Sequence, residues 1–517
     1  MADFLPALPE TVLRCRMFQT EVELGELAPR LLSQVPMNQP SILPMLIQGG
    51  MGIGVSDWRL ARAVAGRGQL GVVSGTAIDT LFIRRLQDGD PGGHLRRAMA
   101  HFPIPGVADD VLRRYFVDGG IPAEARYALL PMWQQRVSAA REQVAILASF
   151  VEVWLAREGH DGPVGMNLLM KIPLPNMATL YGAMLAGVNA VLMGAGIPRD
   201  IPGVLDALAE HRPAEMKLEV EHLPAGRQES LHFDPARHWT PTAPLHRPYF
   251  LAIISSNVLA LTLARKSSGK VDGFIVEGPT AGGHNAPPRG DLRLNEHSEP
   301  IYGERDIVDL EKLCELGLPF WLAGGTGSPG ALERALAAGA AGVQVGTLFA
   351  FCNESGIEPT LKARILAALN RDEVEVFTDP VASPTDYPFK WLHMKNDPDD
   401  PRRARRTRIC DLGYLRAAYV AEDGSIKYRC SSEPVEQYVA KGGDIAKTVD
   451  RRCLCNGLLA NLGHGQWRGE EGREPPLITS GSDLTDLRNL VAGRTRYTAD
   501  DAIDWIIRKN PQPGHPG

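Results

Sequence analysis

The residues of this 517-residue chain that could do chemistry together are a histidine and several glycines that follow short apolar runs. His284 comes after Gly282-Gly283, a few residues beyond the apolar run 273–276, and two more apolar runs end at Gly324-Gly325 and Gly346-Thr347. Glycine turns let the backbone approach a phosphate or a planar ligand closely. An imidazole titrates near neutrality and can take a proton from a carbon acid. The grouping indicates an enzyme site, whereas a loop histidine alone would as readily be solvated.

Polar side chains at the ends of two other apolar runs are further candidates. Gln48, which precedes Gly49-Gly50, and Asn167 each carry an amide that can donate to and accept from the edge of a heteroaromatic ring. A cap or turn role is an equally good interpretation of each. Lys171 could meet a phosphate or a ring carbonyl, but we favour a surface position for it.

Eight apolar runs end in small or polar residues, and helix-period segments follow most of them. They are 43–47, 70–73, 164–166, 190–193, 249–254, 273–276, 320–322 and 342–345. Eight such units predict an α/β fold of the (β/α)8 TIM-barrel type, with the active site at the strand ends. A doubly wound sheet would instead follow its first strand with a glycine fingerprint and an acidic residue about twenty residues later. In this chain the second apolar run ends at Ser74 and not at an acidic residue, so the barrel is favoured.

Two stretches exceed a minimal barrel, namely residues 79–161 and the region after the eighth strand and its helix. Residues 79–161 are too long for a loop and contain helix-period segments, notably 141–157, which predicts a helical insertion over the strand ends. We therefore divide the chain into an N-terminal extension (1–42), a barrel domain (43–375) carrying that insertion, and an appended C-terminal module (376–517).

Composition and charge narrow the class of protein. Apolar residues make up 44% of the chain, and the net charge of −6 is small for this length. Basic residues are not gathered into a stripe, so we expect a small-molecule substrate and no nucleic acid. The N-terminus lacks the pattern of a secretory signal, and the longest apolar segment, 249–264, is too short to cross a bilayer. A cytoplasmic protein without membrane contact is expected.

Four of the seven cysteines lie in the C-terminal region: Cys410, Cys430, Cys453 and Cys455. Four thiolates can form a closed zinc or iron–sulfur site. Their spacing matches none of the usual signatures, because the common pair has two intervening residues. Packed free thiols are therefore the favoured interpretation, no metal is expected, and the four cysteines remain weak candidates.

Five motifs together resemble a known family. They are Gln48-Gly-Gly-Met51, Gly165-Met-Asn167-Leu168, Gly278-Pro-Thr-Ala-Gly-Gly-His284, Ala323-Gly-Gly-Thr326 and Gly342-Val-Gln-Val-Gly-Thr347. In order and spacing they are similar to the nitronate monooxygenase family, formerly called 2-nitropropane dioxygenases. The same superfamily includes flavin-type enoyl-acyl-carrier-protein reductases. The resemblance spans about 43–351.

The resemblance implies a barrel that binds FMN without a covalent bond, with its phosphate on the glycine turns after the last two strands. The residues that it assigns to FMN are Gln48, Gly49, Gly50, Asn167, Gly282, Gly283, Gly324, Gly325, Gln344, Gly346 and Thr347. His284 matches the family's catalytic histidine, which in the monooxygenases accepts the proton alpha to a nitro group.

Departures from the family pattern leave the substrate open. Thr280 stands where a glutamate is usual, Asn285-Ala286-Pro287 replaces a glycine, and Gly49-Gly50 stands where Ala-Pro is commoner. The first hypothesis is an FMN-dependent oxidation of alkyl nitronates or nitroalkanes by O2. The second is an NAD(P)H-dependent enoyl reductase that acts on enoyl thioesters in fatty acid or polyketide synthesis. The third is a non-catalytic barrel that binds a synthase or another partner. The sequence does not decide whether copies of the chain form a homo-oligomer.

Overall fold

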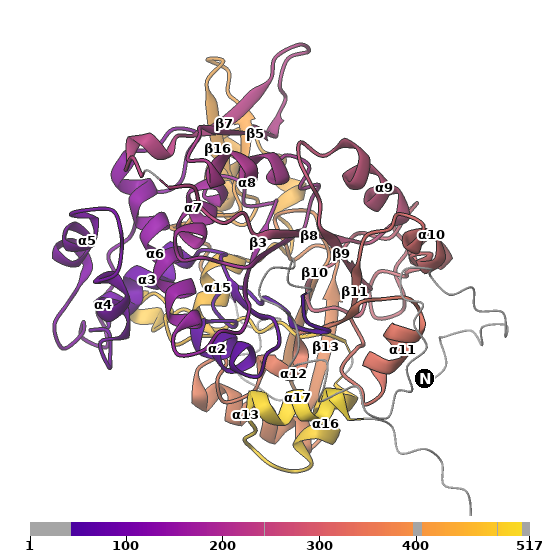
Figure 1. Cartoon of the computed structure of the whole chain (residues 1–517). Coiled ribbons are helices and arrows are strands. Elements are labelled where there is room, and N and C mark those ends of the chain that lie inside the picture. The colour runs from indigo at the N-terminus through magenta and orange to yellow at the C-terminus, as the bar shows by residue number, and fades with distance from the viewer. Residues whose placement is uncertain (1–42, 242, 396–405, 483, 509–517) are drawn as a thin grey trace, which may run out of the picture.

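Eight parallel strands close into a barrel in the computed structural model, which describes residues 43–241, 243–395, 406–482 and 484–508 (Figure 1). The strands are β1 (Leu46–Gln48), β2 (Gly71–Ser74), β3 (Val164–Leu169), β4 (Ala190–Gly194), β8 (Tyr249–Ile254), β9 (Gly273–Glu277), β11 (Phe320–Ala323) and β12 (Gly342–Val345). Each pairs with the next, and β12 pairs with β1. A parallel bridge between Ile47 and Leu70 closes the ring. The predicted TIM barrel is confirmed, while the extension expected at 1–42 lies outside the described residues.

The barrel strands are apolar on both faces, which is why each appears as a nearly continuous apolar run in the sequence. One set of buried side chains fills the interior of the barrel: Ile47, Leu70, Val72, Ala190, Leu192, Leu251, Ile275, Trp321 and Ala323. The alternate residues, such as Leu46, Val73 and Val191, belong to the larger core that the helices cover. A period-two alternation therefore exists, but it separates two apolar layers and not an apolar face from a polar one.

Helices follow the strands and form the outer layer. They are α2 (Trp58–Gly66), α6 (Ala139–Arg157), α7 (Asn176–Leu185), α8 (Ile201–Ala209), α9 (Asn257–Lys266), α10 (Leu310–Cys314), α11 (Ala331–Ala337), α12 (Thr347–Ala350) and α13 (Pro359–Asn370). Asp57 begins α2 by accepting hydrogen bonds from the backbone N–H groups of Arg59 and Leu60. α6 packs against both α2 and α7, so it occupies the place of the helix that follows the second strand.

The remaining part of the predicted helical insertion lies outside the ring. α3 (Ile78–Gln87), α4 (His94–Met99) and α5 (Val107–Tyr115) pack against α6, at the left of Figure 1. We expected this insertion over the strand ends. The structure instead places α4 and α5 beside the barrel wall, because α6 is apolar on most sides and needs cover on its outer face.

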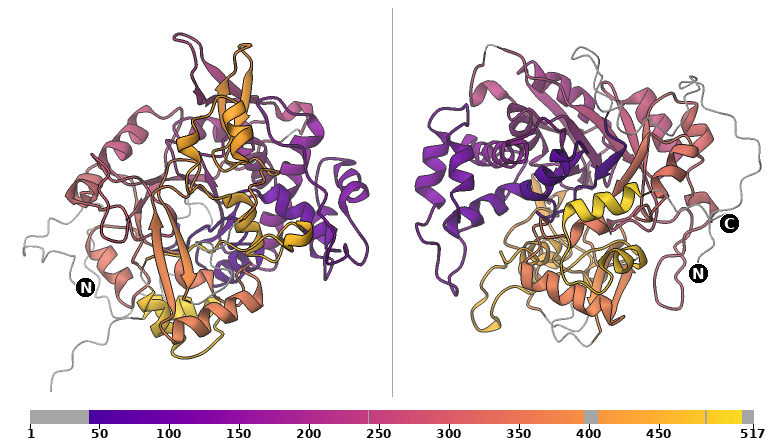
Figure 2. Two further views of the ribbon diagram at one scale, coloured as in Figure 1. Left: turned by 180° about the vertical axis from the view of Figure 1, so that it is seen from behind. Right: turned by 60° about the horizontal axis from the view of Figure 1, so that its bottom comes forward.

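The C-terminal region lies across the barrel, as the orange and yellow segments show from behind (Figure 2). Its elements are β13 (Val374–Asp379), β14 (Phe389–Met394), β15 (Ala417–Val420), β16 (Ile426–Arg429), α14 (Val435–Ala440), α15 (Leu454–Ala460), α16 (Thr485–Val491) and α17 (Ala499–Ile507). β14 pairs with β10 (Gly283–His284), and β15 pairs with β6 (Val220–Glu221). β5 (Ala214–Leu218) and β7 (Glu229–Phe233) form a separate hairpin. The boundary that we placed after residue 375 falls inside β13.

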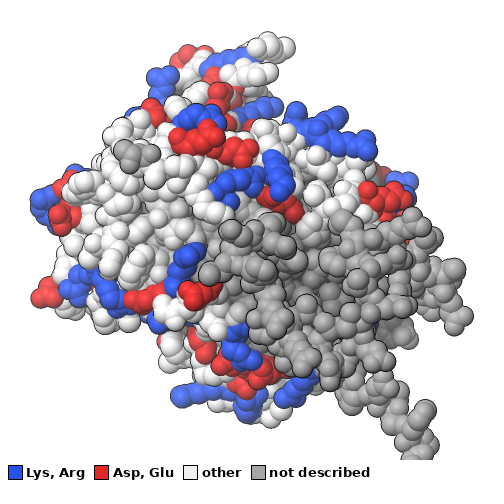
Figure 3. Space-filling model, in the orientation of Figure 1, with Lys and Arg blue, Asp and Glu red and all other residues white. Residues whose placement is uncertain are grey.

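The surface carries mixed charge. On the face shown in Figure 3, Lys and Arg side chains are interspersed with Asp and Glu side chains. Among the helices of the described ranges, none combines the length and the apolar character needed to cross a membrane.

Candidate active site

A large pocket opens at the carboxyl ends of the barrel strands. Residues at or just beyond the end of every one of the eight strands line it, as a TIM-barrel active site requires. The unoccupied space within it, including the part open to solvent, is about 1670 Å³. The C-terminal region supplies a further wall through Tyr414, Leu415, Leu454, Leu458 and the segment 479–481. The pocket is therefore built by the barrel and the C-terminal region together.

Eleven of the twelve predicted site residues line this pocket. They are Gly49, Gly50, Asn167, Gly282, Gly283, His284, Gly324, Gly325, Gln344, Gly346 and Thr347. Gln48 does not. Its side-chain oxygen accepts from the backbone N–H of Val72 (3.0 Å), and its Nε2 donates to Ser56 Oγ (2.8 Å). The fully buried amide joins β1 to β2, so the structure gives Gln48 a positioning role in place of the ring contact that we expected.

His284 is held on one side of the pocket by the C-terminal region. It pairs with Phe389 of β14, whose ring meets the imidazole edge to face at 4.9 Å. Its Nε2 lies 2.8 Å from Ser383 Oγ. Burial, and then the positive charge of Lys171, lower the pKa of His284 to about 4. The imidazole is therefore neutral at pH 7, the form that accepts a proton. Lys171 is half-buried, with its Nζ 5.0 Å from the ring centroid of Tyr387.

Polar atoms in the pocket wall are left for a ligand. Gln344 Oε1 and Ser480 Oγ are both buried without a hydrogen-bond partner in the protein. Such groups are costly unless something pairs with them. Thr347 Oγ1 accepts from the backbone N–H of Gly481 (3.0 Å), so the hydroxyl proton of Thr347 remains available to donate. These groups fit a ligand rich in acceptors and donors, as the polar edge and side chain of a flavin are.

The glycine turns have the conformation that close approach to a ligand requires. Gly324 and Gly325 have φ of 89° and 69°, the left-handed region that residues with a Cβ rarely adopt. Among the described residues that line the pocket there is no Lys or Arg, while Asp486 lies close to Gly327. A phosphate at this end would be held by backbone N–H groups and hydroxyls, without a cationic side chain.

Two residues at or beside the pocket were not predicted from the sequence. Glu277 ends β9 and lines the pocket, and burial raises its pKa to about 7 although Lys390 acts in the opposite direction. The rule that selected Gln48 and Asn167, a polar residue at a strand end, would have found Glu277 as well. Ser383 carried no comparable signal, because only the chain's return places it against His284.

Gly50→Ala is expected to reduce ligand binding in the pocket. A Cβ at this position would lie 2.2 Å from the Cβ of Asn167, which is far inside van der Waals contact. The overlap must displace Asn167 from the pocket wall and cost about 1–3 kcal/mol in unfolding free energy. Flavin content and a urea unfolding curve measure the two effects. Gly303→Ala is the matched control, because its Cβ would meet nothing within 4 Å. Equal flavin content in the two variants would contradict the expectation.

Glu277→Gln is expected to stabilise the protein only when the pH is high. The folded-state pKa of about 7 exceeds the ordinary value of 4.5, so the folded protein binds more protons than the unfolded chain between these values. The wild type therefore loses stability as the pH rises from 4.5 to 7, and the glutamine variant does not share that loss. Thermal unfolding at pH 4.5 and pH 8 would show equal stability at the lower pH and a more stable variant at the higher. A difference that does not change with pH would exclude this origin.

Part of the site lies within a segment that matches a known family. Residues 228–383 match the family model described as nitronate monooxygenase. This segment contains β8, β9, β11 and β12, the glycine turns at 324–325 and 346–347, His284 and Ser383. The chain thus resembles that family over its second half-barrel, as its motifs predicted. No curated protein matches the chain.

Several solved structures are similar to this chain at low identity. FabK from Thermotoga maritima is 16% identical, with 90% of this chain and 92% of that chain covered and a TM-score of 0.42. A nitroalkane oxidase from Streptomyces ansochromogenes is 16% identical, with 90% and 94% covered and a TM-score of 0.39. The enoyl reductase domain of MlnA, from the macrolactin biosynthesis cluster of Bacillus amyloliquefaciens, is 12% identical, with 90% and 93% covered and a TM-score of 0.43.

Proposed function

We propose that this protein is an FMN-dependent oxidoreductase that oxidises alkyl nitronates or nitroalkanes with O2, with His284 as its catalytic base. The observation that carries the proposal is the position of His284, a neutral imidazole in the wall of a pocket that glycine turns also line. A base that is neutral at pH 7 can accept the proton alpha to a nitro group. The match of residues 228–383 to the nitronate monooxygenase family supports the same chemistry.

The chain's own groups would prepare the substrate for reaction. Ser383 fixes the orientation of the imidazole through its contact with Nε2. Phe389 packs on the ring and, with Leu415 and Leu458, keeps water from that side of the pocket. Gln344 Oε1, Ser480 Oγ and the Thr347 hydroxyl are free to bind the cofactor's polar groups. FMN bound there would supply the electron acceptor for the substrate carbon.

A second function, an NAD(P)H-dependent reduction of enoyl thioesters, is favoured by the shape of the pocket. Leu415, Leu454 and Leu458 of the C-terminal region add an apolar wall that suits an acyl chain. Glu277, whose pKa of about 7 lets it carry a proton near neutral pH, could return that proton to a substrate carbon.

The visible spectrum of the purified protein tests the proposal. A yellow protein that releases FMN on denaturation supports a flavoenzyme, and a colourless protein that cannot be loaded with FMN contradicts it and favours a binding subunit. Anaerobic addition of NADPH or of a nitronate then separates the two reactions. Anaerobic bleaching by a nitronate, followed by O2 uptake when air is admitted, indicates the monooxygenase. Anaerobic bleaching by NADPH, followed by loss of an added enoyl thioester, indicates the reductase.

A further inference from the structure

The substrate of the proposed reaction needs a positive charge that the pocket wall does not provide. A nitronate is an anion, and a nitro group or a thioester carbonyl gains negative charge on oxygen as it reacts. None of the described residues that line the pocket is a Lys or an Arg. Lys390 lies near the pocket, but it is buried and its Nζ donates to Thr378 Oγ1 (2.6 Å). It is also attracted to Glu299 and Glu277, so its charge is already in use.

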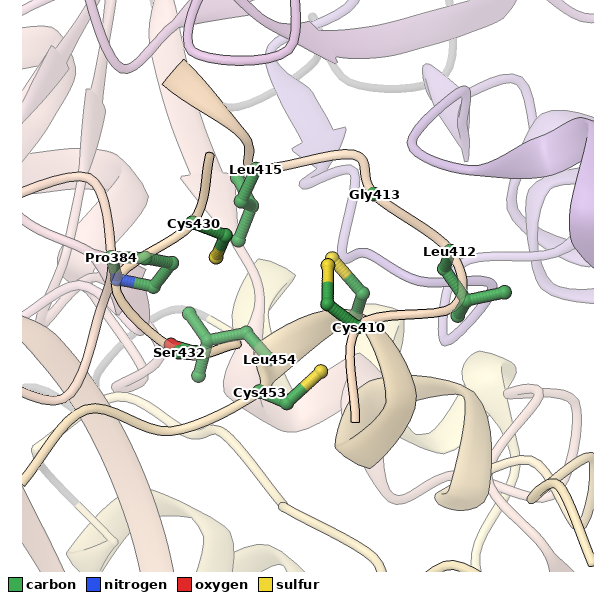
Figure 4. A pocket seen from close by; sticks show the side chains of 10 residues that line it. Pro384, Cys410, Leu412, Gly413, Leu415, Cys430, Ser432, Cys453 and Leu454 are labelled. Atoms are coloured by element: carbon green, nitrogen blue, oxygen red, sulfur yellow. The ribbon is translucent and has the colours of Figure 1, made fainter. Parts of the chain in front are cut away.

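The C-terminal wall of the pocket offers no cation either. Behind it, Cys410, Cys430, Cys453 and Cys455 line a separate hollow, and Figure 4 shows the first three of these side chains turned toward a common space. The four cysteines are free thiols, and the hollow has room for about one water molecule. Within the described residues, no group of three or more His, Cys, Asp or Glu side chains could hold a metal ion. Packed thiols therefore remain the favoured interpretation of these cysteines.

Lys171 stands at the carboxyl end of the barrel strands, where the pocket opens. It comes two residues after β3, in a turn that is closed by a hydrogen bond from the Ile172 N–H to the Leu169 oxygen (3.1 Å). Leu169 and Ile172 both line the pocket. The sequence favoured a surface position for Lys171, but the structure buries about half of the side chain. The lysine thus stands at the edge of the pocket, although it is not part of the lining.

A contact with Tyr387 places the ammonium on the same side of the pocket as His284. The Nζ of Lys171 lies 5.0 Å from the centroid of the Tyr387 ring. Two residues after Tyr387, Phe389 pairs with His284 and packs on its imidazole. Burial and the positive charge of Lys171 together lower the pKa of His284, which agrees with this position. The ammonium is therefore within electrostatic reach of the base.

The ammonium of Lys171 is available to a ligand. In the part of the chain that the structure describes, no carboxylate lies within ion-pair distance of its Nζ, and its contact is the ring of Tyr387. A contact with the face of a partly exposed ring is weaker than a hydrogen bond to a negatively charged oxygen. The side chain has four rotatable bonds, so an anionic group beside His284 would draw the ammonium into the pocket.

We propose that Lys171 binds the substrate oxygen that carries or gains negative charge while His284 acts on the neighbouring carbon. When His284 takes the proton alpha to a nitro group, the electron pair of the broken C–H bond moves onto the nitro oxygens, and the ammonium hydrogen-bonds to one of them. A nitronate would make the same contact on binding. An enoyl thioester would present its carbonyl oxygen. The role in turnover rests on the proposed function.

Steady-state kinetics of Lys171→Met, with a nitroalkane and with its nitronate, test the proposal. For the nitronate, kcat/KM should fall about ten- to a hundredfold, mainly through KM, because the anion loses a charged hydrogen bond. For the neutral nitroalkane the loss should lie in kcat, because the negative charge appears only in the transition state. Lys171→Arg keeps the charge and should retain most of the activity. Equal rates in the wild type and Lys171→Met, or equal losses in the methionine and arginine variants, would overturn the proposal.

Nitrate binding separates this proposal from the proposed function. Nitrate is a planar anion whose oxygens resemble those of a nitronate, and it requires no turnover. Calorimetric titration of the full-length protein should show about tenfold weaker nitrate binding, or less, in Lys171→Met than in the wild type. Lys312→Met is the matched control, because Lys312 is exposed and paired with Asp309 (2.8 Å), and it should bind nitrate as the wild type does.

The two measurements together identify which proposal fails. Weaker nitrate binding in Lys171→Met, in a protein that turns over neither nitro compounds nor enoyl thioesters, would keep Lys171 as an anion-binding residue and remove the proposed function. Turnover of a nitro compound with the same nitrate affinity in the wild type and Lys171→Met would do the reverse. Thermal unfolding and FMN content check that each variant is folded, and Lys171→Gln replaces the methionine variant if that one does not fold.

Discussion

Replacing His284 by alanine is expected to lower kcat by about a hundred- to ten-thousandfold while FMN remains bound, the loss typical of a missing general base. The imidazole belongs to a different segment from Gly324-Gly325 and Gly346-Thr347, so its removal leaves the backbone of the turns that would hold the phosphate unchanged. Steady-state rates with nitronate or enoyl thioester, normalised to flavin content, measure the effect. Rates equal to those of the wild type would remove His284 from the mechanism.

Two further variants separate catalysis from folding. His246→Ala alters an exposed histidine and should leave the rate unchanged. Ser383→Ala removes the partner of Nε2 and should cost less than the loss of the ring itself, because Phe389 still packs on the imidazole.

The pH profile gives an independent measure of His284. Since its pKa is lowered to about 4, the acid limb of kcat/KM should fall near pH 4 and not near the ordinary 6.5. The unfolded chain binds the extra proton between these values, so the wild type also loses stability as the pH falls through this window. The alanine variant should lack that contribution.

Replacing Asp79 by alanine is expected to destabilise the protein by about 3–5 kcal/mol, because it leaves Arg141 buried without its counter-charge. Asp79 Oδ2 accepts from Arg141 Nη2 (2.7 Å) and from Trp133 Nε1 (3.0 Å). Its Oδ1 accepts from the hydroxyl of Tyr414 (2.5 Å). Burial alone would raise the pKa of Asp79, but Arg141 and Tyr414 overcome this and hold it below its ordinary value. The carboxylate is therefore charged at neutral pH.

The same substitution should weaken flavin binding, since Tyr414 joins this ion pair to the pocket wall. Urea unfolding of the full chain measures stability, and flavin release measures the pocket. Asp110→Ala is the matched control because its pair with Arg113 is exposed, so a change under about 1 kcal/mol is expected there. A loss for Asp79→Ala no larger than for the control would show that the buried network does not hold the insertion to the C-terminal region.

The barrel could be predicted because its signal is local. Each strand is buried on both faces, so every one of the eight appears as an apolar run of its own, and each of the eight runs overlaps one barrel strand. The length of a run does not show how its neighbours pair, and the count of eight fits a doubly wound sheet as well. The absence of an acidic residue after the second strand, where Ser74 stands, favoured the barrel. Glu277 could also have been predicted as a site residue, since it is the polar residue that ends β9.

The walls of the site could not be predicted from the same signals. Thr479 accepts from the backbone N–H of Gly283, 196 residues earlier in the chain, and Ser383 meets His284 across 99 residues. These contacts depend on β14 pairing with β10, a pairing of two residues that carries no periodic pattern. The role of Gln48 was equally hidden, because an amide at a strand end can face a ligand or the adjacent strand.

The sequence by itself determined the barrel, the strand ends and the cluster of glycine turns around His284, because apolar periodicity and backbone freedom are properties of consecutive residues. Only the tertiary structure decided which side chains those turns face. It turned Gln48 inward, gave α6 a place in the helix ring, and brought the C-terminal region back to complete the pocket and gather four cysteines beside it. Such contacts follow from the packing of surfaces that are distant in the chain, which no local pattern records.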